Sequence, residues 1–423
     1  MNRYDYARVL LDFDIAGCYL EAPMHISRRN FFSRIAAGVA AGAAASDLEA
    51  LAPAAPGSRS SSSPSEKTIR LDMNVNPYGP SPRVLKVIRE NPEMVNKYPD
   101  SEYGPLVEQI ARFHKVRPGQ VTVGDGSREI LRMAIGAYLA EGKRLVLASP
   151  TFEPMAGFAK QAKADVAAIP LNKRFAHDLD AMLHQTTAPA ALVYICNPNN
   201  PTGSLTARKD IETFLDRLPP NVMVLIDEAY HEYVGPSSDY VSFIDHPVDD
   251  KRVIVVRTFS KIYGLAGLRL GYAVSSEEVS LKLSFLRLER GVNILAVLAA
   301  VAALDDPDYV QLSFRKNADS RQEFYNQTNT RMLRQVDSLT NFVFMKTGLP
   351  SSQVIEHFGR NNITLGPPVP QMDRYVRVTI GAREDMREFW RVWDLQPGGS
   401  HNMASNQSRT NPSGRDRGGS VSL

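Results

Sequence analysis

Short apolar runs rich in β-branched residues alternate with helical stretches through the middle of the chain, and this alternation limits the folds open to it. The predicted strands are Arg144–Ala148, Asp165–Ile169, Ala191–Cys196, Val222–Ile226, Val253–Val256 and Leu268–Val274. Strands separated by helices form a mainly parallel sheet, with the helices packed on its faces. The sequence therefore predicts an α/β fold whose large domain contains a mainly parallel sheet.

Chemically suggestive residues and segments follow four of the predicted strands. In open α/β sheets ligands bind beyond the carboxyl ends of the strands, so these segments are expected to converge on one edge. They are Phe152, Asn197–Gly203, Asp227–Tyr230 and Lys261 with its neighbours. That edge is the predicted site.

Lys261 stands shortly after a run, 252–256, that reads as a buried strand. An amine with little access to water favours its neutral form and can attack a carbonyl. Thr258 and Ser260 flank it, and Arg269 follows in the same segment, a set suited to holding a phosphate beside a Schiff base. Taken alone, the segment is better explained as a surface lysine at a strand end.

A glycine-containing turn at 124–126 leads from a strand into the helical pattern 130–139. Backbone amides at Gly126, Ser127 and Arg128 are predicted to face an anion, helped by the partial positive charge of the helix start. Glu129 occupies the place of the third glycine of a dinucleotide-binding fingerprint, which argues against that class of site.

The C-terminal part has a mixed pattern. We expect a helix from about Pro307 to Leu333, strands at Asn341–Met345 and Tyr375–Ile380, and helices at Ser352–Phe358 and from Glu384. This predicts a small α+β domain at 331–395 after a large domain at 105–330, with an N-terminal arm at 68–104 completing the small domain.

The first 45 residues resemble a leader with a twin-arginine signal peptide. Arg28 and Arg29 precede a modest apolar run, 35–45, that ends in small residues and is too short to span a membrane. The leader predicts export through the twin-arginine machinery to a periplasmic or other extracytoplasmic place; without it the protein would be cytoplasmic. Cleavage would remove Cys18, leaving Cys196 and no intramolecular disulfide.

Composition separates the folded body from its ends. Residues 46–67 read as a flexible linker and 396–423 as a disordered tail, because neither has the apolar residues to form a core. The 49 basic and 46 acidic residues give a net charge of +3, too balanced to indicate a nucleic-acid partner.

Three motifs together resemble the pyridoxal-phosphate (PLP) aminotransferases of the aspartate aminotransferase fold, fold type I. They are Asn-Pro-Asn-Asn-Pro-Thr-Gly at 197–203, Asp-Glu-Ala-Tyr at 227–230, and Ser-Lys at 260–261 followed by Gly-Leu-Ala-Gly-Leu-Arg at 264–269. The resemblance covers 71–389 and is greatest to the histidinol-phosphate aminotransferase branch.

The resemblance implies a role for each residue near the cofactor ring. Lys261 would form the covalent link to the cofactor aldehyde and move a proton, and Asp227 would pair with the pyridine nitrogen. Tyr230 and Asn200 would hydrogen-bond the ring oxygen, and Phe152 would stack on the ring. From the residues alone, Asp227 also fits a capping or turn role, Asn200 an Asx turn, and Phe152 the core.

The resemblance also implies binding of two anionic groups. Arg377 would hold the substrate α-carboxylate as a planar, bidentate donor. The groups implied around the cofactor phosphate are Gly126, Ser127, Arg128, Thr258, Ser260 and Arg269.

The resemblance also implies an assembly of two subunits. Tyr98 resembles a tyrosine that the neighbouring subunit supplies to the site, so a homodimer is expected.

One departure bears on the substrate. Histidinol-phosphate enzymes have an arginine for the substrate phosphate near 363–365, and this chain has Gly366-Pro367-Pro368 there. We therefore expect an aminotransferase for an L-amino acid with a different, apolar or aromatic, side chain. A PLP-dependent decarboxylase or lyase of the same fold, and a non-catalytic PLP- or amino-acid-binding protein, are the alternatives.

Overall fold

The structure is a computed structural model that describes residues 68–99, 103–248 and 250–396. The predicted leader with its twin-arginine motif, the linker and all but the first residue of the predicted tail lie outside the described residues. Cys18 lies outside them too, and Cys196 is buried with a free thiol.

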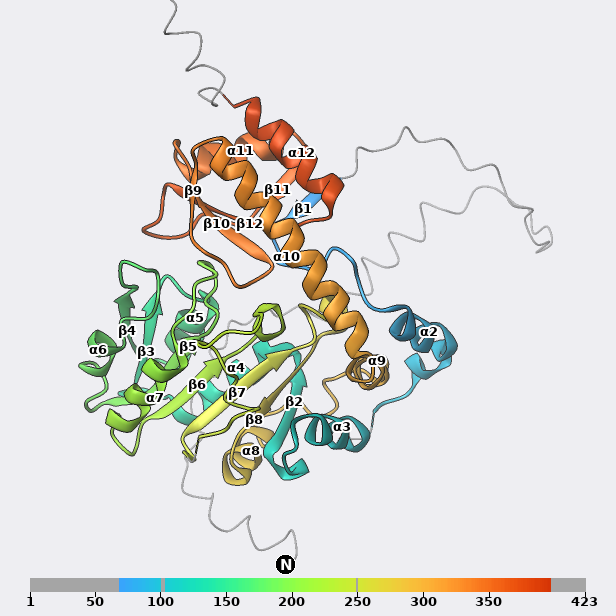
Figure 1. Ribbon diagram of the computed structural model, residues 1–423. Coiled ribbons are helices and arrows are strands. Elements are labelled where there is room, and N and C mark those ends of the chain that lie inside the picture. The colour runs from blue at the N-terminus through green and yellow to red at the C-terminus, as the bar shows by residue number, and fades with distance from the viewer. Residues whose placement is uncertain (1–67, 100–102, 249, 397–423) are drawn as a thin grey trace, which may run out of the picture. The chain divides into compact units, whose positions relative to one another are not determined.

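A seven-stranded sheet forms the centre of the large domain (Figure 1), in the order β2-β8-β7-β6-β5-β3-β4. Only β8 runs antiparallel to its neighbours, so the predicted mainly parallel sheet is confirmed. The strands are β2 (Val121–Asp125), β3 (Arg144–Ser149), β4 (Asp165–Pro170), β5 (Ala190–Cys196), β6 (Met223–Asp227), β7 (Val253–Thr258) and β8 (Leu270–Val274).

Among the boundaries that differ from the prediction, two lie at the predicted phosphate site. The strand expected from Leu268 begins at Leu270, because Ala266–Leu268 form a 3-10 helix and Arg269 has a left-handed φ of 56°. The helix expected from Ile130 begins at Gly126 as α4 (Gly126–Tyr138). In the observed structure the turn at Arg269 lies against the first turn of α4, which begins at Gly126.

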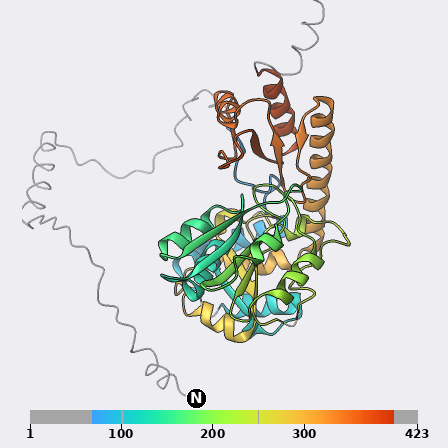
Figure 2. The same cartoon turned by 90° about the vertical axis from the view of Figure 1, so that its left-hand side faces the viewer.

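Helices cover both faces of this sheet (Figure 2). Along β6, Val224 and Ile226 face one apolar cluster while Leu225 faces the other. The first cluster includes residues of α3 (Gly104–His114), α7 (Arg208–Arg217) and α9 (Ile294–Leu304), and the second those of α4, α5 (Pro154–Gln161) and α8 (Glu277–Ser284). A short helix, α6 (Leu179–Leu183), also belongs to the large domain. Burial of both faces explains the near-continuous apolar strands.

A smaller antiparallel sheet, β12-β10-β9, forms the C-terminal part. Its strands are β9 (Arg334–Gln335), β10 (Phe342–Lys346) and β12 (Tyr375–Thr379), packed with α11 (Ser351–Arg360) and α12 (Arg383–Asp394). The long α10 (Pro307–Thr330) leads into it and contributes Phe324, which stacks at a tilt against Trp390 with centroids 4.9 Å apart.

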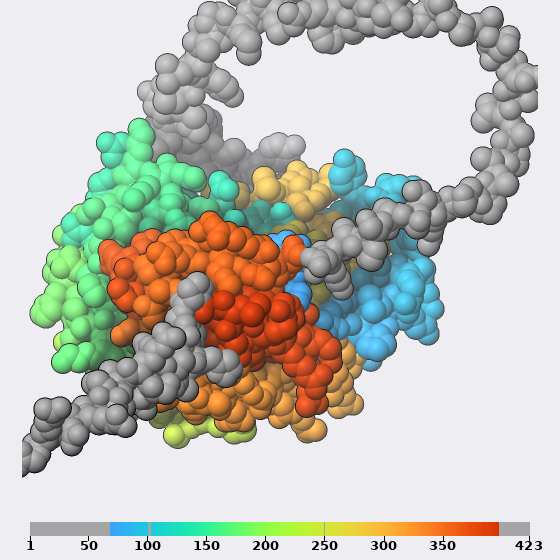
Figure 3. All heavy atoms as spheres, turned by 90° about the horizontal axis from the view of Figure 1, so that it is seen from above, coloured from blue at the N-terminus to red at the C-terminus, as the bar shows by residue number. Residues whose placement is uncertain are grey.

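The N-terminal arm joins the C-terminal part. Its strand β1 (Ile69–Leu71) pairs in parallel with β11 (Ile363–Leu365), and the blue and orange segments lie together in Figures 1 and 3. Helix α2 (Pro82–Glu90), capped by Ser81, then packs on α9. Asn96, expected in an extended segment, ends the 3-10 helix Pro92–Asn96 instead.

None of the helices in the described part of the chain is both long enough and apolar enough to cross a membrane.

Candidate active site

Lys261 follows β7 and lies against the N-terminal arm. Its Nζ donates hydrogen bonds of 3.1 Å to the carbonyl oxygens of both Met73 and Asn74. Burial, with the nearby positive charges of Arg377 and Arg269, lowers the pKa of Lys261 to about 7. The amine is thus available in its neutral, nucleophilic form near neutral pH.

Asp227 is the last residue of β6 and is 4% exposed. Its Oδ2 accepts a 2.9 Å hydrogen bond from the Tyr194 hydroxyl, and its Oδ1 accepts one of 3.1 Å from the Ala229 amide. Burial raises the pKa of Asp227 to about 6, while both hydrogen bonds and the charge of Lys261 oppose that rise. A carboxylate in this setting can pair with a protonated ring nitrogen.

Tyr230, Asn200 and Arg377 form a connected group. Arg377, on β12, donates 2.8 Å to Asn200 Oδ1 and 2.5 Å to the Asp72 carbonyl oxygen, while Asn200 Nδ2 lies 3.4 Å from the Tyr230 hydroxyl. The Nε of Arg377 is buried and has no hydrogen-bond partner among the residues that the structure describes. Each terminal nitrogen of the guanidinium carries a second N–H besides the one used in these bonds, and these groups beside the unpaired Nε suit a carboxylate ligand.

A cradle for an anion lies where α4 begins. Gly126 has φ +72°, and a Cβ there would lie 2.2 Å from Nη2 of Arg269. A Cβ on Gly271 would lie 2.3 Å from the Ser127 amide nitrogen. Arg269 also donates a 3.3 Å hydrogen bond to Ser260 Oγ. The two glycines let a guanidinium, a hydroxyl and the start of a helix meet, and these are the groups that bind phosphate.

The other predicted residues are placed less directly. The guanidinium carbon of Arg128 lies 5.9 Å from the ring centroid of Phe152, which is partly buried against the core at the start of α5. Thr258 shapes the turn, since its Oγ1 accepts from the Ser260 amide at 3.1 Å. Tyr98 is 83% exposed and lies beside Arg290, 6.0 Å from ring centroid to guanidinium carbon.

Two residues of the site carry no signal in the sequence motifs. Tyr194 lies within a strand, and only the register of β5 on β6, where Cys196 pairs with Asp227, places it on the face of Asp227. Asn74 belongs to the arm, yet its Nδ2 lies 3.0 Å from the Tyr230 hydroxyl. Strand alternation applied to Tyr194 could have found the first; nothing local could have found the second.

A buried ion pair fixes the strand ends next to the site. Arg257 is 2% exposed, and it donates a 2.8 Å hydrogen bond to Glu228 and one of 2.7 Å to Ser242. Because Glu228 follows Asp227 and Arg257 precedes Thr258, this pair holds the ends of β6 and β7 together.

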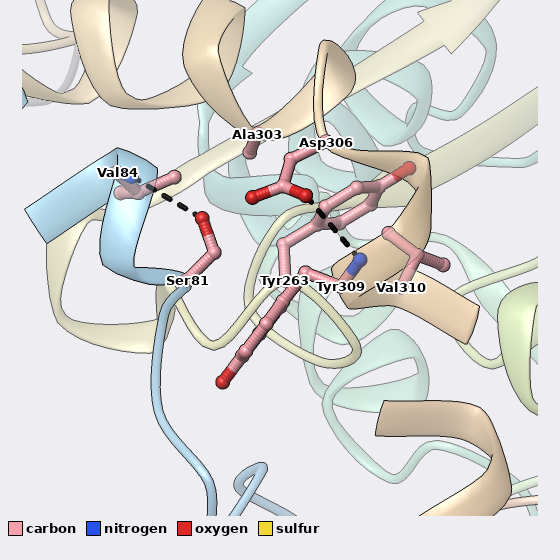
Figure 4. Close-up of a pocket in the computed structure, with 7 residues that line it drawn as sticks. All are labelled: Ser81, Val84, Tyr263, Ala303, Asp306, Tyr309 and Val310. Carbon is pink, nitrogen blue, oxygen red and sulfur yellow. Dashed lines mark hydrogen bonds between the residues drawn. The ribbon is translucent and has the colours of Figure 1, made fainter. Parts of the chain in front are cut away.

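A small pocket lies where the arm meets the loop after Lys261 (Figure 4). Ser81 and Val84 of the arm, Tyr263 of the loop, and Tyr309 of α10 are among its lining residues, and its volume is about 10 Å³. This space holds one water molecule at most, so the arm packs closely on the loop.

Comparison with known proteins agrees with this geometry. Residues 66–392 match the family described as aminotransferase class I and II. A histidinol-phosphate aminotransferase of Bacillus cytotoxicus is 36% identical over 325 residues, which is 76% of this chain and 87% of that protein. A histidinol-phosphate aminotransferase 2 of Carboxydothermus hydrogenoformans is 37% identical over 314 residues, 74% of this chain and 86% of that protein.

Solved structures agree as well. The histidinol-phosphate aminotransferase of Sinorhizobium meliloti in complex with pyridoxal-5'-phosphate superposes with a TM-score of 0.73 at 27% identity. The superposition covers 80% of this chain and 92% of that one.

The fold and the site define a PLP-dependent transferase of fold type I. The cradle at Gly126 and the unpaired Nε of Arg377 fit a phosphate and a carboxylate, and Lys261 with Asp227 fits the aldehyde and the ring nitrogen. The chain belongs to the class I and II aminotransferases, and it is a PLP-dependent transaminase similar to the histidinol-phosphate aminotransferases.

Proposed function

We propose that this aminotransferase moves an amino group between an L-amino acid and a 2-oxo acid, with Lys261 as its nucleophile and proton carrier. The single observation that carries these roles is the position of the Lys261 amine, with a pKa of about 7, within electrostatic range of the buried Asp227 carboxylate at the end of the neighbouring strand. PLP, when bound, supplies the electron sink that makes the substrate Cα–H acidic.

The residues of the chain then divide the work. The negative charge of Asp227 would stabilise the positive charge of the protonated ring nitrogen, so the nitrogen keeps its proton. Arg377 orients the substrate through its α-carboxylate, for which it offers two forked donors and the unpaired Nε. Lys261 accepts the proton from the substrate Cα and delivers it to the cofactor carbon that takes up the amino group. Closure by the arm, which lies over Lys261, limits the access of water.

We propose further that the substrate side chain is apolar or aromatic. The position that would hold a phosphate-binding arginine is Gly366, and a Cβ there would lie 3.0 Å from Arg377 Nε and 3.1 Å from Arg377 Cβ. The carboxylate-binding arginine therefore fills the space that a side chain at this position would need.

A screen of amino donors tests the substrate class. The PLP-bound protein, starting at Glu66, is mixed with single amino acids and with histidinol phosphate. The carbonyl product of each donor is measured, which is a 2-oxo acid from an amino acid and an oxo phosphate ester from histidinol phosphate. We expect turnover with leucine-like or phenylalanine-like donors in preference to histidinol phosphate. Preferred turnover of histidinol phosphate contradicts the proposed side-chain class, and carbon dioxide without any 2-oxo acid favours the decarboxylase alternative.

We propose that the active unit is a homodimer. Large apolar side chains are exposed close to the site: Tyr98 is 83% exposed, Phe285 79% and Leu288 65%. The last two belong to a segment whose Leu288 amide donates 2.9 Å to Glu129 in the first turn of α4. Sedimentation velocity is expected to give twice the mass of one chain, and Phe285→Asp is expected to give one chain and lose activity.

We propose that the protein is exported by the twin-arginine machinery. The supporting observation is the order of paired arginines, modest apolar run and small residues at 28–45. Fractionation of cells that express the full chain tests it: the wild-type protein is expected in the periplasm, and Arg28→Lys with Arg29→Lys is expected to retain it in the cytoplasm. If the wild-type protein and the double lysine variant are retained equally in the cytoplasm, the proposal is overturned.

A further inference from the structure

Asn200 presents its N–H group to Tyr230, and the reason is chemical. A guanidinium can only donate, so the 2.8 Å contact from Arg377 fixes Oδ1 of Asn200 on the arginine side. The amide nitrogen is then the atom that lies 3.4 Å from the Tyr230 hydroxyl.

Asn74 presents its N–H group to the same hydroxyl from the opposite element. The backbone N–H of Asn74 donates 3.0 Å to Thr379 Oγ1, and the Thr379 hydroxyl donates 3.2 Å to Asn74 Oδ1. If the side-chain amide of Asn74 were rotated by 180°, Thr379 Oγ1 would face two N–H donors of Asn74. The Thr379 hydroxyl proton would then have no acceptor among these groups. Nδ2 of Asn74 is therefore the atom that lies 3.0 Å from the Tyr230 hydroxyl.

Tyr230 thus receives two hydrogen bonds on its hydroxyl oxygen. A phenolic hydroxyl has two acceptor positions and one proton. Because both contacts from Asn74 and Asn200 use acceptor positions, the proton is left to donate elsewhere. The Tyr230 ring lies 5.7 Å from Lys261 Nζ, on the side where the reaction occurs.

The arm holds Asn74 in one conformation. Asn74 has a left-handed φ of 52° and is 2% exposed, and its carbonyl oxygen accepts from Asn341 Nδ2 at 3.0 Å as well as from Lys261. Asparagine and aspartate tolerate this φ better than other side chains with a Cβ. Two residues on, Asn76 Nδ2 donates 2.8 Å to the Ile262 carbonyl oxygen, which anchors the arm to the lysine loop.

We propose that Asn74 is a positioning residue that holds the Tyr230 hydroxyl as a hydrogen-bond donor toward the ring oxygen of the cofactor. This inference rests on the proposed role of Tyr230. With this role for Asn74, the arm would both cover the cofactor and help to set the pH at which the bound cofactor loses its proton. Through Thr379, two residues beyond Arg377 on β12, the same asparagine links that tuning to the strand that holds the substrate carboxylate.

The test compares cofactor spectra across a set of PLP-bound variants. Asn74→Asp keeps the size and the tolerance for a left-handed φ but offers only acceptors, so the Tyr230 proton turns away from the cofactor. Asn74→Ala removes the donor without adding charge. Asn91→Asp is the matched control, since it makes the same change on the same arm at a side chain whose Nδ2 donates 2.8 Å to the Val87 carbonyl oxygen and not to the Tyr230 hydroxyl. Tyr230→Phe and the double variant with Asn74→Ala complete a cycle.

The readouts are the pH at which the visible absorbance of bound PLP changes and the dissociation constant for PLP, with thermal unfolding as a check of folding. A donor to the ring oxygen stabilises the deprotonated form of the bound cofactor, which carries an unshared negative charge there. Losing it raises the pH midpoint, so we expect a rise of about one unit in Asn74→Ala and more in Asn74→Asp. Asn91→Asp is expected to stay near wild type.

In the Tyr230→Phe background, Asn74→Ala is expected to add no further shift, because the two residues act as one unit. Equal midpoints in Asn74→Asp and Asn91→Asp would overturn the inference, and so would a shift that persists in full without the Tyr230 hydroxyl. A wild-type protein without any PLP absorbance would contradict the proposed function itself, whereas PLP binding with unshifted variants contradicts only the role of Asn74.

Discussion

The Tyr194 hydroxyl donates a 2.9 Å hydrogen bond to Oδ2 of Asp227, and the two side chains come from adjacent strands of the large sheet. Tyr194 is 0% exposed and Asp227 is 4% exposed, so the contact is shielded from water. A buried carboxylate without donors would take up a proton and lose its charge. Tyr194 therefore helps Asp227 to remain an anion at the end of β6.

Replacing this donor is expected to narrow the active pH range. The hydrogen bond from Tyr194 lowers the pKa of Asp227, which burial raises to about 6, so Tyr194→Phe raises that pKa further. The carboxylate is then lost at a higher pH as acid is added, and the acidic limb of kcat/KM should move up by about one unit. Tyr240→Phe, a buried tyrosine whose partner is His231, serves as the control. An unchanged acidic limb would show that Tyr194 does not tune Asp227.

Sequence reasoning located the parts of the site that follow strands, because parallel strands end at one edge whatever the details of packing. Lys261 and Asp227 belong to this set. Asn74 does not, since its contact with Tyr230 spans 156 residues and depends on how the arm crosses the sheet. The predicted start of the strand at Leu268 was wrong for a related reason. The turn at Arg269 brings its side chain against Gly126, and the local sequence does not encode this long-range contact.

Gly126→Ala is expected to weaken cofactor binding. The added Cβ would sit 2.2 Å from Arg269 Nη2 at a φ of +72°, so it displaces the guanidinium and strains the backbone. We expect a loss of about 1 to 3 kcal/mol in stability and at least a tenfold weaker affinity for PLP.

The control for this change is Gly157→Ala within α5, where a Cβ meets nothing within 4 Å. It is expected to be neutral or to stabilise the helix by about 0.5 to 1 kcal/mol. Calorimetry and titration with PLP check both variants, and tight PLP binding by Gly126→Ala would refute the cradle.

Arg377→Lys is expected to act on the substrate and spare the cofactor. An ammonium keeps the charge but cannot present two parallel donors to a carboxylate. KM for the amino donor should rise by about 10- to 100-fold while the absorbance of bound PLP stays unchanged. Arg374→Lys is the matched control, because Arg374 donates a 3.0 Å hydrogen bond to the Gly348 carbonyl oxygen. Similar KM values in both variants would remove Arg377 from the substrate site.

Lys261→Met is expected to stabilise the cofactor-free protein near neutral pH. The pKa of Lys261 falls from 10.5 to about 7 in the folded state, so between these values the unfolded chain binds more protons and stability rises with pH. Removing the amine removes this cost, by on the order of 2 kcal/mol at pH 7 after the loss of its two carbonyl contacts, and the gain should shrink toward pH 10. Urea unfolding at several pH values measures it; a gain independent of pH would point to packing alone.

The central claim is that the amine of Lys261 carries the cofactor. Reduction of the PLP-bound protein with borohydride, followed by proteolysis and mass spectrometry, tests it most directly. We expect one pyridoxyl-phosphate group per chain on the peptide that contains Lys261, and none in Lys261→Ala. A label on another lysine, or no label on a protein that has bound PLP, would contradict the account.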